Sequence, residues 1–311
     1  MNAIFNAAGI SKQAFHQWRS RWQIQRGMEE QILYLIRQIR WDHPGMGVRD
    51  IYHKLFPLPI GRDKFEDLCR SHRLLIEIVR NPCRTTDSRG VKRFPNLLKE
   101  LTIERPNQVW QSDITYFEVS GKFCYLTFIQ DAYTKLILGW SASRNLTTEA
   151  TTIPALAMAI NWNRTMDLSE LILHSDGGGQ YYDAVFLKMT ASAQIKNSMC
   201  EEAWENGMAE RLNGVIKRNY LRHKSITSFE QLCREVDRTV YLYNFEKPHK
   251  KLKRMTPMQF VNKSLPSMQQ LPLRMKKSFD AKFKGQGHRA PDPLKQLPLR
   301  TQNVISAKFE S

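Results

Sequence analysis

The sequence lacks cysteine and histidine pairs at the spacing of zinc ligands, and it lacks any apolar run of membrane-spanning length. Its N-terminus has no apolar segment of the kind found in secretory signal peptides. The cysteines are scattered singly, which is typical of reduced and mostly buried thiols; they are Cys69, Cys83, Cys124, Cys200 and Cys233. We therefore expect a cytoplasmic protein without a zinc finger and without a membrane partner.

Acidic residues are also scarce. The 311 residues include 47 lysines and arginines but 30 aspartates and glutamates, which gives a net charge of +17 and a pI near 9.8. The excess of positive charge lies at the two ends of the sequence. Residues 1–100 contain 18 basic and 10 acidic residues, and residues 269–311 contain 9 basic and 3 acidic residues. Residues 101–268 are nearly balanced, with 20 basic and 17 acidic residues. This distribution favours nucleic acid as a partner, held by basic ends around a nearly neutral folded body. A generally basic protein with a solvated tail is the alternative.

Residues 1–79 predict a helical DNA-binding region with two helix-turn-helix units. The first unit is a turn and short helix within residues 1–22, with Ser11 as N-cap. A separate helix follows over residues 28–41, and the second unit lies within residues 48–75 after a break. Outward-facing cations on these units are candidate DNA contacts: Lys12, Arg19, Arg62 and Lys64. Capped structural helices without a ligand are the alternative.

The rest of the chain divides into a basic linker (80–104), a folded core (105–263) and a basic, loosely ordered tail (264–311). The core elements follow the order β-β-β-α-β-α-β-α, which predicts an α/β fold with a mixed five-stranded sheet and helices on its faces. The expected strands are 109–117, 122–129, 136–143, 171–174 and 195–198, and the expected helices are 147–163, 183–193, 206–222, 228–245 and a last one from 257.

Three acidic residues of the core indicate a metal-dependent site. Asp113 lies in the first strand, Asp176 ends a buried strand before three glycines, and Glu210 lies near the start of a helix. Lys217 follows Glu210 by seven residues, or two helical turns, and therefore shares its face. Carboxylates suit Mg²⁺ or Mn²⁺, and two such ions stabilise both oxygens in a phosphodiester displacement. Each residue alone has an ordinary explanation as a turn, edge or solvated residue, whereas the ordered set indicates chemistry.

Four segments resemble the motifs of DDE transposases of the insertion-sequence-3 family, of the second-frame type: RPNQVWQSDITYF, HSDGGGQYY, NGMAERLNGVIKRNYL and YNFEKPHKKLKRMTPMQF. The resemblance implies an RNase H-like fold similar to the retroviral integrase core, preceded by helix-turn-helix modules. It also implies that Asp113, Asp176 and Glu210 are catalytic and bind the metal, and that Lys217 contacts DNA near the scissile end. Other residues match motif positions without an assigned role, and two of them, Gln180 and Asn206, are candidate DNA contacts; the others are His174 and His249.

The sequence departs from the family pattern in two places. Residue 177 is a glycine where the family usually has a basic residue, and the 33 residues between Asp176 and Glu210 are slightly fewer than usual. The second departure predicts a shorter loop around residues 198–205.

These features predict a transposase that cuts DNA at terminal inverted repeats and joins the resulting 3′ ends to target DNA, using two Mg²⁺ or Mn²⁺ ions. The expected partners are double-stranded DNA, further copies of the chain and a first-frame protein fused by frameshifting. Two alternatives stay open. One is a DNA-binding regulator or inactive transposase remnant, and the other is an RNase H-like nuclease that does not join strands.

Overall fold

The computed structural model describes residues 9–76, 94–200 and 203–264, and these residues form two compact units, one before residue 77 and one after residue 93. The predicted tail and most of the predicted linker lie outside the described residues. Among the described residues, no helix is both long and apolar enough to cross a membrane.

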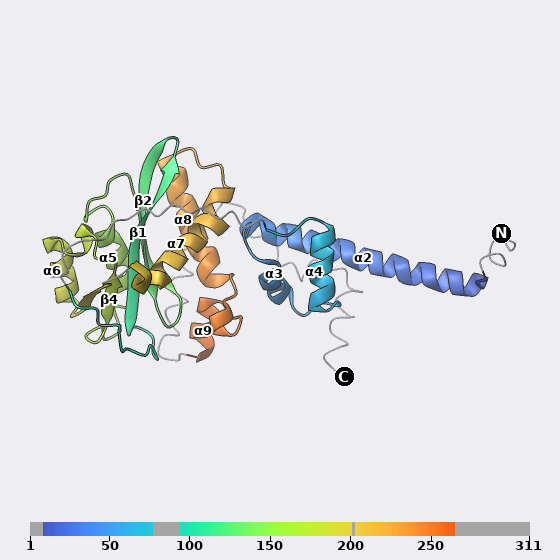
Figure 1. The fold of residues 1–311 in the computed structure, drawn as a ribbon, viewed down its shortest axis with the longest axis horizontal. Helices are drawn as coiled ribbons and strands as arrows, with labels where there is room; N and C mark the ends of the chain where they lie inside the picture. The colour runs from blue at the N-terminus through green and yellow to red at the C-terminus, as the bar shows by residue number, and fades with distance from the viewer. Residues whose placement is uncertain (1–8, 77–93, 201–202, 265–311) are drawn as a thin grey trace. The chain divides into compact units, whose positions relative to one another are not determined.

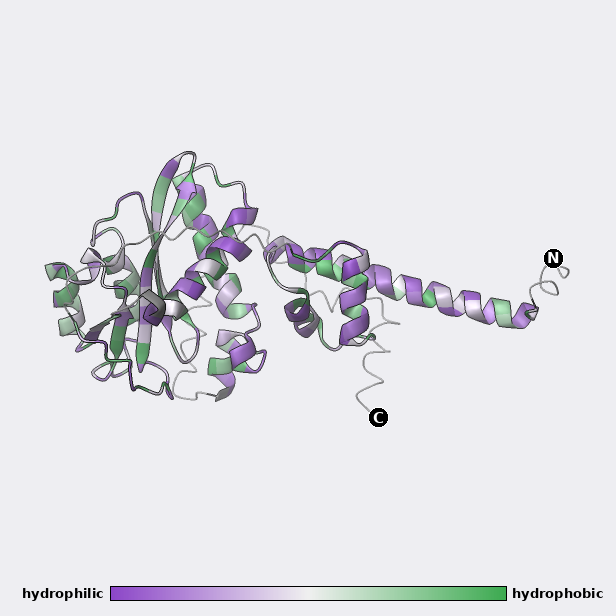
Figure 2. Ribbon diagram, in the orientation of Figure 1, coloured by the Kyte–Doolittle hydropathy of each residue, from purple (hydrophilic) through white to green (hydrophobic). Residues whose placement is uncertain are grey.

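Three helices form the first unit and bury their apolar faces in a common core. They are α2 (Lys12–Asp42), α3 (Val48–Leu55) and α4 (Arg62–Ser71). Ser11 caps α2, since its hydroxyl accepts a hydrogen bond from the amide of Ala14. The core confirms the predicted apolar stripes and includes Ile32, Leu35, Ile36, Ile39, Ile51, Leu55, Phe65, Leu68 and Cys69. Figure 2 shows that α4 is otherwise mostly hydrophilic.

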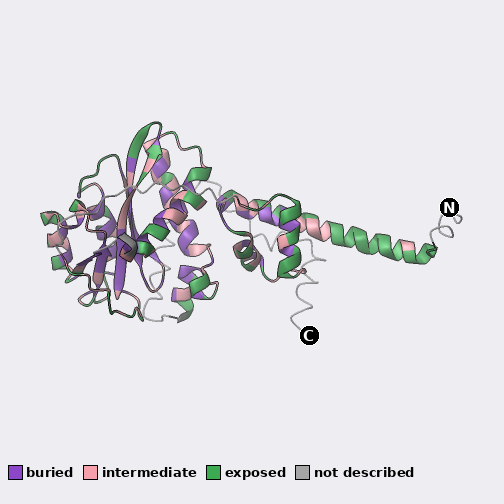
Figure 3. Cartoon of the chain, in the orientation of Figure 1, coloured by how far each residue is buried: buried purple, intermediate pink, exposed green. Residues whose placement is uncertain are grey.

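The prediction of a separate short helix within residues 1–22 is wrong, because α2 runs without interruption for 31 residues. Gly27 lies in its interior, but one glycine costs a helix only about 1 kcal/mol relative to alanine. The residues around Gly27 are glutamine, arginine, methionine and glutamate, which favour a helix. Trp18 is 59% exposed and stacks on Trp22, so this end of α2 faces solvent (Figure 3). The described residues of this unit therefore contain the two short helices predicted for the second helix-turn-helix unit, α3 and α4, but no separate helix for the first.

A mixed sheet organises the second unit (Figure 1). Its strands are β1 (Val109–Val119), β2 (Lys122–Asp131), β3 (Ile137–Ser143), β4 (Ile172–Ser175) and β5 (Lys196–Met199). The first three are antiparallel, β4 and β5 add in parallel, and the strand order is β3-β2-β1-β4-β5. The β1–β2 turn has Ser120 and Gly121 at φ of 49° and 77°, the conformation that a two-residue hairpin requires. The predicted RNase H-like five-stranded sheet is confirmed.

Helices cover both faces of this sheet. They are α5 (Thr152–Trp162), α6 (Ala184–Ser192), α7 (Gly207–Asn219), α8 (Phe229–Phe245) and α9 (Pro257–Ser264). Neighbouring residues of β3 show the two faces. A side chain at Gly139 would collide with the Ala155 carbonyl of α5, whereas Trp140 Nε1 donates to Asp237 of α8 at 2.7 Å. Because α7 contacts β1 and β2, it lies beside the strand that carries Asp113.

The helix boundaries of the second unit agree with the sequence within one residue, except at the start of α5 and at the end of α7, which ends at Asn219 and not at residue 222. The predicted start at residue 147 is five residues early, because residues 148–151 form a turn in which the amide of Thr151 donates to the Thr147 carbonyl. The predicted N-cap of α9 is confirmed. Thr256 Oγ1 accepts from the amide of Gln259 at 3.1 Å, and Gln259 Oε1 accepts from the amide of Thr256 at 2.9 Å.

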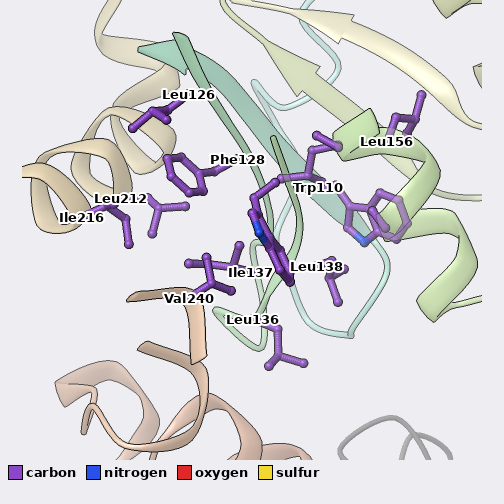
Figure 4. Packing of buried hydrophobic residues seen from close by; sticks show 14 of the residues in the cluster. Trp110, Leu126, Phe128, Leu136, Ile137, Leu138, Leu156, Leu212, Ile216 and Val240 are labelled. Atoms are coloured by element: carbon purple, nitrogen blue, oxygen red, sulfur yellow. The ribbon is translucent and has the colours of Figure 1, made fainter. Parts of the chain in front are cut away.

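A large apolar core holds β1 in place (Figure 4). Trp110 has no exposed surface, and its Nε1 donates to Asn107 Oδ1 at 3.0 Å. Phe128, which is 1% exposed, is the β2 partner of Asp113 in the sheet register. Asp113 therefore projects from a strand whose position is fixed by packing before any ligand binds.

Candidate active site

Asp113 lies in the middle of β1 and is held by the helix that packs over that strand. Asn213 of α7 donates from Nδ2 to Asp113 Oδ2 at 2.8 Å. Burial, the nearby Asp176 and, more weakly, Glu210 raise the pKa of Asp113 to about 7, against the lowering effect of the Asn213 hydrogen bond. Its carboxyl group therefore lies within electrostatic reach of both other acidic residues predicted for the site.

Asp176 follows β4 directly, at the carboxyl end of a strand parallel to β1. Its Oδ1 accepts from the amide of Gly178 at 3.1 Å. This bond fixes the carboxylate against the loop that contains Gly177, Gly178 and Gly179, which we call the glycine loop. Burial raises the pKa of Asp176, and hydrogen bonds from backbone amides oppose that rise. The loop thus holds a carboxylate that is mostly removed from solvent.

Glu210 lies in the first turn of α7 and is exposed. Asn213, three residues further along α7, donates to Asp113, so Glu210 lies on the Asp113 side of the sheet. As the side chains stand, no three aspartate, glutamate, histidine or cysteine residues of the described ranges lie close enough together to hold a metal ion. Asp113, Asp176 and Glu210 are therefore electrostatic neighbours that do not form a three-ligand cluster as their side chains stand.

Lys217 faces the same strand two turns further along α7. Its Nζ donates to Thr115 Oγ1 at 2.6 Å and lies 5.2 Å from the ring centre of Tyr116. Residues two apart on a strand share a face, so Thr115 lies on the face from which Asp113 projects. Burial and the nearby Arg222 lower the pKa of Lys217, whereas Asp113 raises it. The predicted pairing of Glu210 and Lys217 on one helix face is confirmed.

Asn206 and Gln180, both predicted as DNA contacts, make hydrogen bonds within the protein. Asn206 is 1% exposed, and its Nδ2 donates to the Ser112 carbonyl at 3.3 Å, so it ties α7 to β1 next to Asp113. It does not cap α7 through its side chain. Gln180 donates from Nε2 to the Leu146 carbonyl at 2.9 Å. Both amides position backbone around the carboxylates.

Of the two histidines from the sequence motifs, His174 is buried and His249 is half-buried, and burial favours the neutral form of both. His174 has no exposed surface and shares a hydrogen bond of 2.9 Å between Nδ1 and Ser198 Oγ, which links β4 to β5. Burial lowers its pKa to about 4. His249 packs against the ring of Tyr243, and burial together with Lys247 and Lys135 lowers its pKa to about 3.

The cations predicted to contact DNA in the first unit are exposed. Lys12 and Arg19 lie on the solvent-facing part of α2, and Lys64 lies on α4. Arg62 is engaged by acidic neighbours, with Asp63 at 2.8 Å and Glu66 at 3.8 Å.

Sequence reasoning missed two polar residues beside the carboxylates. One is Asn213, described above. The other is Tyr181, which is 3% exposed and whose hydroxyl lies 2.9 Å from Ser112 Oγ. Burial raises the pKa of Tyr181, and the charges of Asp176 and Asp113 raise it further. Both residues lie inside the quoted motifs, but only the packing of α7 and the glycine loop on β1 brings them to the site.

The glycine at position 177 follows from local packing. Its φ is +78°, and a Cβ atom there would overlap the side chain of Met199. A basic residue of the family type at this position would require Met199 to move. The predicted shortening of the loop around 198–205 involves residues 201 and 202, which lie outside the described residues.

We expect Gly177→Ala to lower the free energy of unfolding by about 2–3 kcal/mol, because it combines a left-handed backbone with displacement of Met199. Gly179→Ala is the matched control. A Cβ atom at Gly179 meets nothing within 4 Å, so this change is expected to cost less than about 0.5 kcal/mol. Chemical denaturation of both variants measures the difference, and equal stability of the two would refute this account of Gly177.

Comparison with known proteins points to one family. Residues 103–203 match a family model described as an integrase core domain, and residues 191–257 match a second model with the same description. A Mycobacterium tuberculosis protein named for the transposase of insertion sequence element IS986/IS6110 is 33% identical over 123 residues, or 38% of this chain. The transposase InsF of insertion sequence IS3A from Escherichia coli K12 is 28% identical over 180 residues, or 57% of this chain.

The matched regions span 44% and 62% of the lengths of these two relatives. Among solved structures, the HTLV-2 integrase catalytic core domain in complex with magnesium aligns with 50% of this chain and 96% of that domain, at 22% identity and a TM-score of 0.40. Residues 103–257 thus form an integrase core domain, and the chain is a distant homologue of the insertion-sequence-3 family transposases.

Proposed function

We propose that this chain cuts DNA and joins DNA strands in a metal-dependent reaction, with Asp113, Asp176 and Glu210 at the reacting phosphate. The observation that supports this most is the raised pKa of Asp113, to which burial contributes most, followed by Asp176 and then Glu210. Acidic groups that repel one another in a partly buried site favour a bound cation, because the cation removes the repulsion.

The donor atoms suit a hard divalent cation. Burial and the charge of Asp176 raise the pKa of the Cys200 thiol to about 12, so this neighbour stays protonated and is a poor ligand at neutral pH. His174 bonds to Ser198 through Nδ1, and its Nε2 is buried without a hydrogen-bond partner. The three acidic residues offer carboxylate oxygen, the ligand that Mg²⁺ and Mn²⁺ prefer. When bound, a pair of such ions stabilises both the attacking and the leaving oxygen of a phosphodiester displacement.

We propose that Asp113 and Asp176 are the fixed ligands and that Glu210 is the adjustable one. Asn213 and the amide of Gly178 hold the first two carboxylates at 2.8 Å and 3.1 Å. Glu210 is exposed on its helix and retains rotamer freedom, so it can turn toward the other two as the site fills. Lys217, held over β1, would place a positive charge on a phosphate next to the scissile bond.

For the rest of the chain we propose the division inferred from the sequence. Residues 1–79 would bind the ends of a DNA element, with Lys12, Arg19 and Lys64 as the more available cations because Arg62 is engaged by Asp63. Cutting and joining two ends would require at least two copies of the chain on DNA. A first-frame protein is a further candidate partner, and the bacterial cytoplasm is the expected location.

The proposal is tested with the full chain and a labelled duplex that carries the ends of the encoding DNA element. In Mg²⁺ or Mn²⁺ we expect nicked strands with free 3′ hydroxyl groups and, on addition of target DNA, joined products; EDTA should abolish both. A nuclease would give nicked strands without joined products. Salt-sensitive binding with neither product would contradict the proposal and favour a DNA-binding regulator.

A further inference from the structure

Three cations that are far apart in the sequence meet beside the first turn of α7. Lys135 lies in the β2–β3 turn, Arg211 follows Glu210 on α7, and Lys251 lies in the short 3₁₀ helix Lys250–Leu252. We call these three residues the cation cluster. Burial, the charge of Lys251 and, more weakly, the charge of Arg211 together lower the pKa of Lys135 to about 8, so all three positive groups interact.

The position of Lys135 is fixed by several contacts. Its Nζ donates to the Ala132 carbonyl and contacts Met208 Sδ at 3.2 Å, which puts the ammonium group against the first turn of α7. Asp131 is the acidic residue that favours its charge, but the Asp131 carboxylate already accepts hydrogen bonds from Asn107, Tyr133 and Thr134. The effect of Asp131 on the pKa of Lys135 is nevertheless smaller than the opposite effect of Lys251, so the nearby negative charge does not offset the positive ones.

The turn that carries Lys251 is equally ordered. Gln130 Nε2 donates both to the Lys135 carbonyl and to the Tyr243 hydroxyl, at 2.9 Å each. The Tyr243 ring packs on His249 with 4.7 Å between ring centres, and the amide of Leu252 donates to the His249 carbonyl at 3.0 Å. This chain of contacts ties the turn after His249 to the β2–β3 turn, so the fold itself brings the like charges together.

Such an arrangement favours an anion. Like charges held together by the fold repel one another, and the amino end of α7 adds the partial positive charge of a helix N-terminus. Arg211 and Lys251 are exposed, so a ligand can reach them. Phosphate is the anion that fits a nucleic-acid enzyme of net charge +17.

A second positive group lies at the other end of α7. Lys217 interacts with Arg222 and Arg218, and both arginines lower its pKa after the larger effect of burial. Arg211 and Arg218 are seven residues apart, or roughly 10 Å along the helix. The Lys217 group therefore lies about two helical turns along α7 from Arg211 and is separate from the cation cluster.

We propose that the cation cluster of Lys135, Arg211 and Lys251 is a second phosphodiester-binding site, which holds the target DNA while the Lys217 side holds the cut end. This assignment rests on the proposed function, because joining requires two DNA segments at one set of carboxylates. The cluster supplies a place for the second segment that neither the carboxylates nor Lys217 can supply.

The test uses Lys251→Gln and Lys251→Glu in the full chain with Mg²⁺, since Lys251 is exposed and its replacement leaves the buried contacts of Lys135 intact. One assay measures nicking of the element end, and the other measures joining of a pre-cut end to labelled target DNA. At subsaturating target DNA, we expect the rate of joining to fall about threefold to tenfold in Lys251→Gln, because one phosphate contact is lost. The rate should fall further in Lys251→Glu. Nicking should change less than twofold. Lys188→Glu, an exposed change on α6, is the matched charge control and should leave both rates near wild type.

The outcomes separate the two proposals. Equal losses of nicking and joining would overturn the target assignment, because the cluster would then hold the end that is cut. Unchanged joining would overturn the site altogether. If the wild-type chain neither nicks nor joins, the proposed function fails, and duplex binding still tests the cluster. Loss of one phosphate contact lowers the slope of log affinity against log salt by about 1. An unchanged slope in Lys251→Gln would refute the phosphate site by itself.

Discussion

Asp113→Asn is expected to lower metal-dependent DNA nicking by about a thousandfold or more, because it removes a carboxylate charge from the proposed metal site. A factor of a thousand corresponds to about 4 kcal/mol, within the several kcal/mol that metal-ion stabilisation of a phosphoryl oxygen supplies. Glu118→Gln is the matched control, since Glu118 is an exposed acidic residue of the same strand. Single-turnover nicking at saturating Mg²⁺ measures both variants. Activity of Asp113→Asn within tenfold of wild type would contradict the assignment.

The same variant carries a stability signature that separates a lost ligand from a damaged fold. The pKa of Asp113 is about 7 in the folded chain, against an ordinary value of 3.8 for an aspartate. Between these two pH values the folded state binds more protons than the unfolded state, so the free energy of unfolding falls as pH rises. Above about pH 7 the folded state carries the full free-energy cost of an ionised Asp113. Asparagine stays neutral and avoids this cost. In EDTA, Asp113→Asn should therefore melt at a higher temperature than wild type at pH 8, and the difference should shrink toward pH 4. A lower melting temperature at pH 8 would show instead that the charge is well accommodated.

Much of the second unit could be predicted from the sequence because its signals are local. The Ser120-Gly121 turn between two β-rich segments determines the hairpin, and Asp183, Ser228 and Thr256 cap helices within a residue of their predicted starts. The end of α5 at Trp162 is equally close to expectation. These features depend on residues a few positions apart, which a linear sequence displays directly.

The failures have a physical cause in common, which is that local patterns do not reveal tertiary partners. Ala14, Phe15 and Trp18 form an apolar stripe, and such stripes usually mark a buried face. In the structure Trp18 is 59% exposed, so the stripe did not mark a core or the end of a helix. Asn213 escaped notice for the opposite reason. Its partner Asp113 is 100 residues away, and no local pattern marks an amide that will hold a carboxylate.

The assignment of the site residues stays a prediction from the sequence motifs. The motifs identified Asp113, Asp176, Glu210 and Lys217, and their mutual electrostatics agree with a shared location. As the side chains stand, Asp113, Asp176 and Glu210 do not form a three-ligand metal cluster. Asp113 and Asp176 are each held by a hydrogen bond, whereas Glu210 is exposed on α7. Motifs specify which residues meet, but rotamers depend on what they bind.

Asp131→Ala is expected to lower the free energy of unfolding of the second unit by about 3–5 kcal/mol, the largest stability effect among these predictions. Asp131 has no exposed surface. Its carboxylate accepts from the amides of Asn107 at 2.8 Å, Tyr133 at 3.1 Å and Thr134 at 2.6 Å, and from Thr134 Oγ1 at 2.7 Å. Alanine would leave these donors without an acceptor in a buried site, and each such donor costs about 1–3 kcal/mol. Burial raises the pKa of Asp131, so the charged carboxylate carries a cost of its own that offsets part of the loss.

The matched control is Asp167→Ala, which removes a carboxylate that accepts from the amide of Ser169 at 2.9 Å on an exposed loop. Water can replace that acceptor, so the change should cost less than about 1 kcal/mol. Chemical denaturation gives the two free energies, and hydrogen exchange shows where the fold opens. We expect faster exchange of Asn107 and of the β1–β2 pairs nearest to it, because Asp131 fixes the residues that lead into β1. If Asp131→Ala were as stable as Asp167→Ala, the strand that carries Asp113 would be held by its apolar core alone.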